Sequence, residues 1–217
     1  MSARAASARP AERPIVFAVT GASGAPYAVR LLEQLVLARR RVQLVVSSHG
    51  LRLLRTELEI ASVAALREHV DRRVGPGLFD AVVTAYDDTD RGAAPASGSA
   101  LTAGMVICPC SMGTLAAIAA GTSRSLVERA ADVTLKERRP LVLVPRETPL
   151  GVIHLENMLR VTRAGAVVLP AAPGFYHRPR TVDDLVDFVV ARILDHLGVD
   201  HALGARWGGG EVAPEGQ

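Results

Sequence analysis

Six short runs of β-branched and apolar residues recur along the chain, and segments with a helical pattern separate most of them. The runs cover residues 15–20, 42–46, 81–84, 105–108, 141–144 and 166–169. The helical segments cover residues 26–38, 51–56, 114–120, 126–136, 153–163 and 182–197, and Thr181 is the expected N-cap of the last. Strands alternating with helices predict an α/β protein in which one parallel sheet carries helices on both faces. We therefore expect a single-domain Rossmann-like (flavodoxin-like) fold.

The two ends of the chain differ in composition from its body. Residues 1–13 are rich in Ala, Arg, Ser and Pro, and residues 208–217 in Gly, Pro and Glu. Such segments bury little apolar surface, so we predict a disordered leader and a flexible tail around a domain at 14–207. Residues 86–103 are rich in small and polar residues and predict a long loop near the functional site.

Charge, cysteine content and hydropathy exclude several classes of function. The formal net charge of +3 includes three arginines in the leader, and no basic run or aromatic–basic pattern predicts nucleic-acid binding. No stretch has the ~20 apolar residues of a membrane helix. Cys108 and Cys110 flank one proline, too close for an ordinary disulfide, which favours a reducing, cytoplasmic location. The six histidines form no ligand cluster, so we expect no metal.

Two turns rich in small residues follow predicted strands and lead into predicted helices. The first runs from Thr20 to Ala25, and the second from Pro109 to Thr114. The N–H groups at such a turn can bind an anion, although the first lacks the G-x-G-x-x-G pattern and could serve tight packing alone. In the second, Ser111 and Thr114 could donate to a phosphate, or Ser111 could simply cap the helix. Ligands of open α/β sheets bind at the carboxyl ends of strands, which favours the anion interpretation.

Charged and aromatic residues downstream allow both a structural and a functional interpretation. Arg129, Asp132 and Lys136 would share one helix face, which could be a solvated, self-paired surface. Arg192 falls on the apolar side of the last helix, where we expect it to point toward the core and to meet a structural carboxylate or a ligand phosphate. Trp207 could cover the site or anchor the C-terminus.

The sequence resembles the flavin prenyltransferase family, formerly described as a 3-polyprenyl-4-hydroxybenzoate decarboxylase subunit. The resemblance spans about residues 14–207 and rests on several ordered blocks. The blocks are TGASGA at 20–25, CPCS at 108–111, ERAADV at 128–133, LKERRPLVL at 135–143, RETP at 146–149 and PGFYH at 173–177.

The resemblance implies a site for FMN and a site for a dimethylallyl phosphate. FMN would be held by Gly21, Ala22, Ser23, Ser47, Ser111, Met112, Gly113, Thr114 and Arg146. The prenyl donor would meet Tyr176, Arg192, Arg129, Lys136 and Glu147, with Glu57 nearby and Trp207 as a possible cover. Of these, Glu57, Glu147, Tyr176, Lys136 and Arg129 are the expected catalytic residues.

The implied reaction joins the dimethylallyl carbon to N5 of reduced FMN, closes a ring at C6 and releases phosphate, without a metal. The cations and Tyr176 would stabilise the departing phosphate, and Glu147 would transfer a proton during ring closure. The prenylated FMN would pass to a UbiD-like decarboxylase, as in ubiquinone biosynthesis, and the enzyme would be a homododecamer.

Two alternatives remain open from the sequence. One is an FMN-dependent cysteine decarboxylase of the same superfamily, against which the turn PCSMGT at 109–114 argues. The other is a flavin carrier without catalysis, against which the set of Tyr176, Arg192, Lys136 and Glu147 argues, because storage needs no prenyl-phosphate site.

Overall fold

A six-stranded parallel sheet forms the centre of the computed structural model, which describes residues 13–204. The strands are adjacent in the order β3-β2-β1-β4-β5-β6, the order of the Rossmann fold. Each run of β-branched residues predicted from the sequence supplies one strand. The strands are β1 (Ile15–Val19), β2 (Val42–Val46), β3 (Val83–Tyr86), β4 (Gly104–Cys110), β5 (Leu141–Pro145) and β6 (Val167–Val168).

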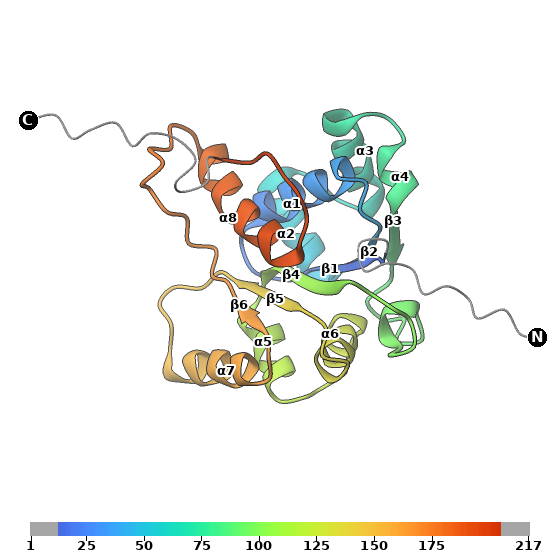
Figure 1. The fold of residues 1–217 in the computed structure, drawn as a ribbon, viewed down its shortest axis with the longest axis vertical. Coiled ribbons are helices and arrows are strands. Elements are labelled where there is room, and N and C mark those ends of the chain that lie inside the picture. The colour runs from blue at the N-terminus through green and yellow to red at the C-terminus, as the bar shows by residue number, and fades with distance from the viewer. Residues whose placement is uncertain (1–12, 205–217) are drawn as a thin grey trace, which may run out of the picture.

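Helices cover both faces of the sheet (Figure 1), as the alternating pattern predicted. One face carries α1 (Ala25–Leu37), α2 (Ser48–Leu58), α3 (Val63–Val74), α4 (Leu78–Val82) and α8 (Val182–Leu197). The other carries α5 (Met112–Ala119), α6 (Leu126–Lys136) and α7 (Val152–Arg163), and a short 3-10 helix η2 (Ala94–Ala96) packs on α6. Among the described residues, no helix is long and apolar enough to cross a lipid bilayer.

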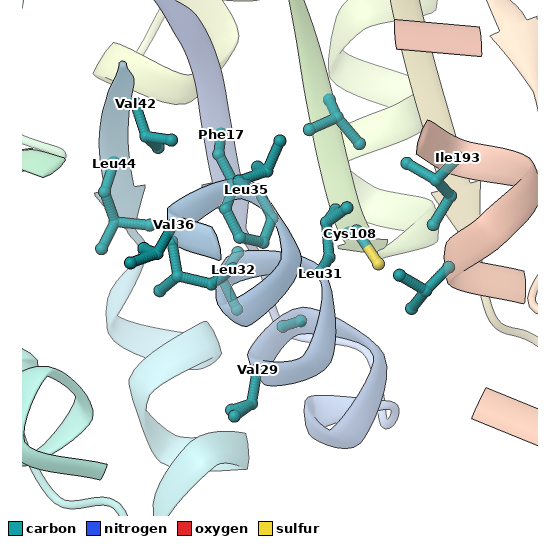
Figure 2. Packing of buried hydrophobic residues seen from close by; sticks show 14 of the residues in the cluster. Phe17, Val29, Leu31, Leu32, Leu35, Val36, Val42, Leu44, Cys108 and Ile193 are labelled. Atoms are coloured by element: carbon teal, nitrogen blue, oxygen red, sulfur yellow. The ribbon is translucent and has the colours of Figure 1, made fainter. Parts of the chain in front are cut away.

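The first core layer lies between the sheet and α1, and its packing follows from the helical spacing of the sequence. Leu31, Leu32 and Leu35 of α1 are fully buried in a cluster with side chains of β1, β2 and β4, and Leu31 lies beside Cys108 of β4 (Figure 2). Ile193 of α8 closes the other side of this layer. Burying a leucine stabilises the fold by about 2 kcal/mol, so α1 is held mainly by this stripe.

A network of charges also fixes α8 against α1. The guanidinium of Arg30 donates from Nε and Nη2 to the two carboxylate oxygens of Asp187, at 2.6 and 3.0 Å. Glu33 is buried and accepts from Arg30 at 3.1 Å and from Arg73 of α3 at 2.7 Å. The buried carboxylate is thus paired on both sides, as burial of a charge requires.

The boundaries differ from the predicted ones mainly between residues 59 and 86. The chain forms α3 and α4 there, which the sequence pattern did not predict, and α4 occupies the first two residues of the predicted strand 81–84. Ser62 caps α3 by accepting from the N–H of Ala65 at 3.0 Å, and only Leu66 and Val70 are buried. Such a narrow apolar stripe among charged residues is a weak helical signal. The predicted N-cap of α8 is confirmed, since Thr181 accepts from the N–H of Asp184.

Candidate active site

The sheet order reverses between β1 and β4, and the two turns singled out from the sequence meet there. Thr20, directly after β1, donates from its hydroxyl to the carbonyl of Pro109 at 3.0 Å. The same hydroxyl accepts from the N–H of Ser111 at 2.9 Å. These two bonds join the carboxyl ends of the central strands at the topological switch point, where doubly wound folds bind their ligands.

Two helices begin at this point with capping serines. Ser47 caps α2 and accepts from the N–H of Gly50 at 3.1 Å; Ser111 caps α5 and accepts from the N–H of Thr114 at 3.2 Å. Within the described part of the chain, no hydrogen-bond acceptor meets the N–H groups of the first two residues of either helix. Two helix N-termini with unpaired donors form a favourable environment for an anion.

A cavity of about 500 Å³ opens at these N-termini, within the size range of small-molecule sites. Five residues predicted to bind the flavin line it: Gly21, Ser47, Ser111, Gly113 and Thr114. The structure therefore brings together residues from three strand-to-helix turns that are distant in sequence.

Close packing explains two glycines beside this cavity. A Cβ on Gly21 would lie 2.5 Å from the Cβ of His49, and a Cβ on Gly50 would lie 2.4 Å from the carbonyl oxygen of Val19. Both distances are shorter than real contacts allow. Glycine at these positions lets α2 approach the end of β1 closely enough for its N-terminus to reach the cavity.

The other predicted flavin residues lie around the cavity rather than in its lining. Arg146 lies after β5 and donates from Nε to the carbonyl of Ser23 at 3.2 Å. This hydrogen bond joins two residues that were predicted to bind the flavin. Ala22 and Met112 are buried in the packing of their turns.

Glu57 has a structural contact that the sequence did not indicate. One of its carboxylate oxygens accepts from the N–H of Gly24 at 3.0 Å and from that of Ala25 at 2.8 Å. The carboxylate thus caps the N-terminus of α1 from the last turn of α2. At this helix, the Glu57 carboxylate occupies the position that the phosphate of a ligand would otherwise take.

A second cavity of about 480 Å³ lies along α8 and contains two predicted donor-site residues, Tyr176 and Arg192. Phe188 forms the apolar wall, with the Tyr176 ring edge-on at 5.6 Å and the His177 ring stacked at 5.2 Å. Both ring nitrogens of His177 are buried without a hydrogen-bond partner among the described residues. The cavity therefore combines an aromatic wall with polar groups.

The prediction that Arg192 points toward the core is wrong. Its side chain is 55% exposed and donates to Asp195 at 3.1 Å, one turn along α8. The apolar stripe that suggested burial is buried through Val189 and Ile193, and Arg192 lies beside this stripe at the mouth of the cavity. An exposed guanidinium needs no buried anion as its partner, because water solvates it.

Arg129 and Lys136 line neither cavity. Arg129 donates to Asp132 at 2.6 Å and to the carbonyl of Ala96 at 3.2 Å, and Lys136 pairs with Glu137 at 2.9 Å. The pair of Arg129 and Asp132 matches the self-paired helix face considered from the sequence, whereas Lys136 pairs with Glu137 instead. Glu147 is exposed in the loop after β5, outside both cavity linings, and Trp207 lies outside the described residues.

The sequence did not reveal several polar residues that line the first cavity, chief among them Asp88, Arg124 and Glu128. Glu128 accepts from the side chain and the N–H of Arg124 and from the hydroxyl of Thr122. Burial opposes its ionisation, but these hydrogen bonds outweigh burial and hold the pKa of Glu128 below its ordinary value. Folding brings the loop at 121–125 to the cavity at the N-terminus of α5. No short-range sequence motif could therefore predict that these residues line it.

These features define a class: a doubly wound α/β protein with a cavity lined by helix N-termini at its switch point, where proteins of this fold bind nucleotide cofactors. The Flavoprotein family model matches residues 3–194. The chain is 51% identical to the flavin prenyltransferase UbiX of Pseudomonas aeruginosa over 197 residues, which cover 89% of this chain and 93% of the relative. It is 49% identical to that of Halalkalibacterium halodurans, covering 88% and 91%. The chain belongs to the flavin prenyltransferase family.

Comparison with solved structures supports the same family. AnUbiX (PadA1), crystallised with FMN and dimethylallyl pyrophosphate, matches with a TM-score of 0.82 and 40% identity, over 92% of this chain and 100% of that one. A dodecameric FMN-dependent UbiX-like decarboxylase from Escherichia coli O157:H7 matches with a TM-score of 0.79 and 41% identity, over 90% and 100%. A PPC decarboxylase mutant at 17% identity and a TM-score of 0.52 shares the fold alone.

Proposed function

We propose that this chain is a flavin prenyltransferase that transfers a dimethylallyl group from dimethylallyl phosphate to N5 and C6 of reduced FMN. The observation that carries the proposal is the convergence of Ser47 and Ser111, each capping a helix with unpaired N–H donors, on one cavity at the switch point. Membership in the flavin prenyltransferase family supports the same activity.

The first cavity fits the phosphate end of FMN. The unpaired N–H groups and the hydroxyls of Ser47, Ser111 and Thr114 offer hydrogen bonds to phosphate oxygens, and the two helix dipoles favour negative charge. Arg146, bonded to Ser23, would hold the first turn against the flavin. Reduced FMN would supply the nucleophilic ring nitrogen and carbon, and the residues of this cavity would orient it by holding its phosphate.

The second cavity supplies groups suited to the prenyl donor. Phe188 offers an apolar surface for the dimethylallyl group, and Tyr176 and Arg192 offer donors to its phosphate. As the bond to the prenyl carbon breaks, negative charge grows on the departing phosphate, and fixed donors stabilise it. Arg192 would exchange Asp195 for this phosphate or bind both through its several N–H groups.

Because Arg129 and Lys136 line neither cavity of their own chain, they would reach the same phosphate from another subunit. We therefore propose a homo-oligomer, specifically a dodecamer. The exposed apolar residues of α7 support an interface: Val152 and Ile153 are 71% and 72% exposed. Glu147, in the exposed loop after β5, would serve as the proton-transfer group in ring closure.

We further propose that the product passes to a UbiD-like decarboxylase and that the enzyme acts in the cytoplasm. A prenylated FMN released from the site that makes it would serve as the cofactor of another enzyme, and a decarboxylase is the recipient we propose. Cys108 and Cys110 are both free and buried, which suits a reducing location.

The test is to incubate the purified protein anaerobically with reduced FMN and dimethylallyl phosphate, and to measure flavin mass and phosphate release. We expect a flavin heavier by one prenyl unit with stoichiometric phosphate. Arg192→Ala and Glu147→Gln should impair transfer, and Arg67→Ala, an exposed arginine of α3 paired with Asp80, should not. Bound FMN whose mass never changes, with the monophosphate or the diphosphate donor, would contradict the proposal and favour a carrier.

A further inference from the structure

Arg124 is the one lysine or arginine in the lining of the flavin cavity, as far as the described residues go. It lies in the loop before α6, with its side chain 75% exposed. The other fully charged residues of the lining are two carboxylates, Asp88 and Glu128. A cavity with this composition would repel a phosphate unless the carboxylates were neutralised and a cation remained available.

Both carboxylates are already engaged by the protein. Asp88 caps α6, since its Oδ1 accepts from the N–H of Val127 at 2.9 Å and its backbone carbonyl accepts from Leu126 at 2.7 Å. Glu128 accepts from the hydroxyl of Thr122 and from the backbone N–H of Arg124. Among the described residues, no hydrogen bond joins Asp88 to Arg124, so Glu128 is the carboxylate that holds the guanidinium.

Arg124 retains donors that no described residue uses. Its Nε donates to Glu128 at 3.3 Å and its Nη2 at 3.0 Å, whereas Nη1 has no acceptor in the described part of the chain. Guanidinium groups carry five N–H donors in a rigid plane, and contact with a carboxylate along one edge leaves another edge available. Glu128 thus orients Arg124 without saturating it.

We propose that Arg124 binds the phosphate of FMN and makes the cavity select FMN over riboflavin. This inference rests on the proposed flavin site and adds a residue to it. The helix N-termini of α2 and α5 would donate neutral N–H groups, and Arg124 would contribute a charge-assisted bond from the loop before α6. Glu128 acts as the positioning residue that holds the guanidinium in place.

The test compares the dissociation constants of oxidised FMN and riboflavin, measured by quenching of flavin fluorescence. Arg124→Ala should weaken FMN binding roughly 10- to 100-fold, the range of a charge-assisted hydrogen bond, and riboflavin binding less than about threefold. Arg124→Lys should retain part of the FMN affinity. Arg67→Ala should leave the dissociation constants of FMN and riboflavin unchanged. If Arg124→Ala weakened the binding of FMN and of riboflavin by the same factor, the proposal would be overturned.

A double variant separates direct binding from neutralisation of Glu128. If Arg124 contacts the phosphate, Arg124→Ala combined with Glu128→Gln still binds FMN weakly; full recovery of FMN affinity would assign Arg124 a merely neutralising role and refute the inference. Should the alanine variants not fold, judged by far-UV circular dichroism, Arg124→Gln against Arg124→Lys gives the same comparison. Flavin binding needs no prenyl donor, so this result is independent of whether the chain transfers a prenyl group.

Discussion

Replacing Gly50 by alanine tests whether α2 must approach β1 as closely as the structure requires. Gly50 lies in the first turn of α2, and its added Cβ would stand 2.4 Å from the carbonyl oxygen of Val19 and 2.8 Å from its carbonyl carbon. The atoms in the way belong to the backbone of a central strand, which cannot rotate aside. To reach the 3.4 Å of ordinary contact, α2 must withdraw by roughly 1 Å.

The expected magnitude follows from two opposing effects. Alanine gains about 1 kcal/mol over glycine as a helix former. Overpacking a rigid site costs about 1–3 kcal/mol, and contact with backbone belongs at the upper end of this range. We expect the free energy of unfolding to fall by about 2 kcal/mol net, which lowers the melting temperature of a domain of this size by roughly 4–8 °C. Because Ser47 moves with α2, FMN binding should weaken as well.

Gly113→Ala is the matched control, since Gly113 occupies the first turn of α5, the other helix whose N-terminus lines the cavity. The nearest heavy atom to its added Cβ is the hydroxyl of Ser111, at 4.0 Å. This variant should therefore gain up to about 1 kcal/mol of stability from helix propensity. The assay is thermal unfolding followed by circular dichroism, at one protein concentration and without flavin. A Gly50→Ala protein as stable as Gly113→Ala would refute the reasoning.

Three further predictions concern charges and thiols. Glu57→Ala should lower the free energy of unfolding by about 2 kcal/mol, through loss of a charged helix cap, and Glu57→Gln by less; equal stability of both variants and the wild type in urea would show that the cap contributes nothing. Glu33→Gln should lower the free energy of unfolding by about 2 kcal/mol in the same assay, because Arg30 and Arg73 lose their buried carboxylate partner. An unchanged urea midpoint would mean that water replaces these ion pairs without loss of stability. Burial raises the pKa of Cys110 to about 12 from 9.0, so unfolding releases a proton between these values and the protein should lose stability as the pH rises above 9.0. A Cys108→Ala/Cys110→Ala protein should lose less over that interval, and the same two thiols should react with a thiol reagent at pH 8 only after denaturation; ready labelling of the native wild type would contradict their burial.

The position of the cavity proposed for the flavin was readable from the sequence because it depends on local features in a known order. A β-branched run, a turn of small residues and a helix occur at Thr20 and again at Ser111, and parallel strands place their carboxyl ends at one edge of the sheet. The hydroxyl bridge from Thr20 to Pro109 and Ser111 realises this expectation. Hydrophobic periodicity likewise sufficed for the six strands and for the helices with wide apolar faces.

Contacts between distant segments were decided only by the tertiary structure. Glu57 caps a helix that begins 32 residues earlier in the chain, and Arg124 lies over the flavin cavity because α6 packs beside β4. Arg192 illustrates the limit of periodicity: a residue at the border of an apolar stripe can turn to solvent with little cost, so the helical pattern cannot fix its direction. The sequence by itself determined the six strands, the helices with wide apolar faces and the turns at the switch point, because these follow from local backbone preference and side-chain period. The charged groups around the cavities depended on long-range packing, which sets which carboxylate meets which cation.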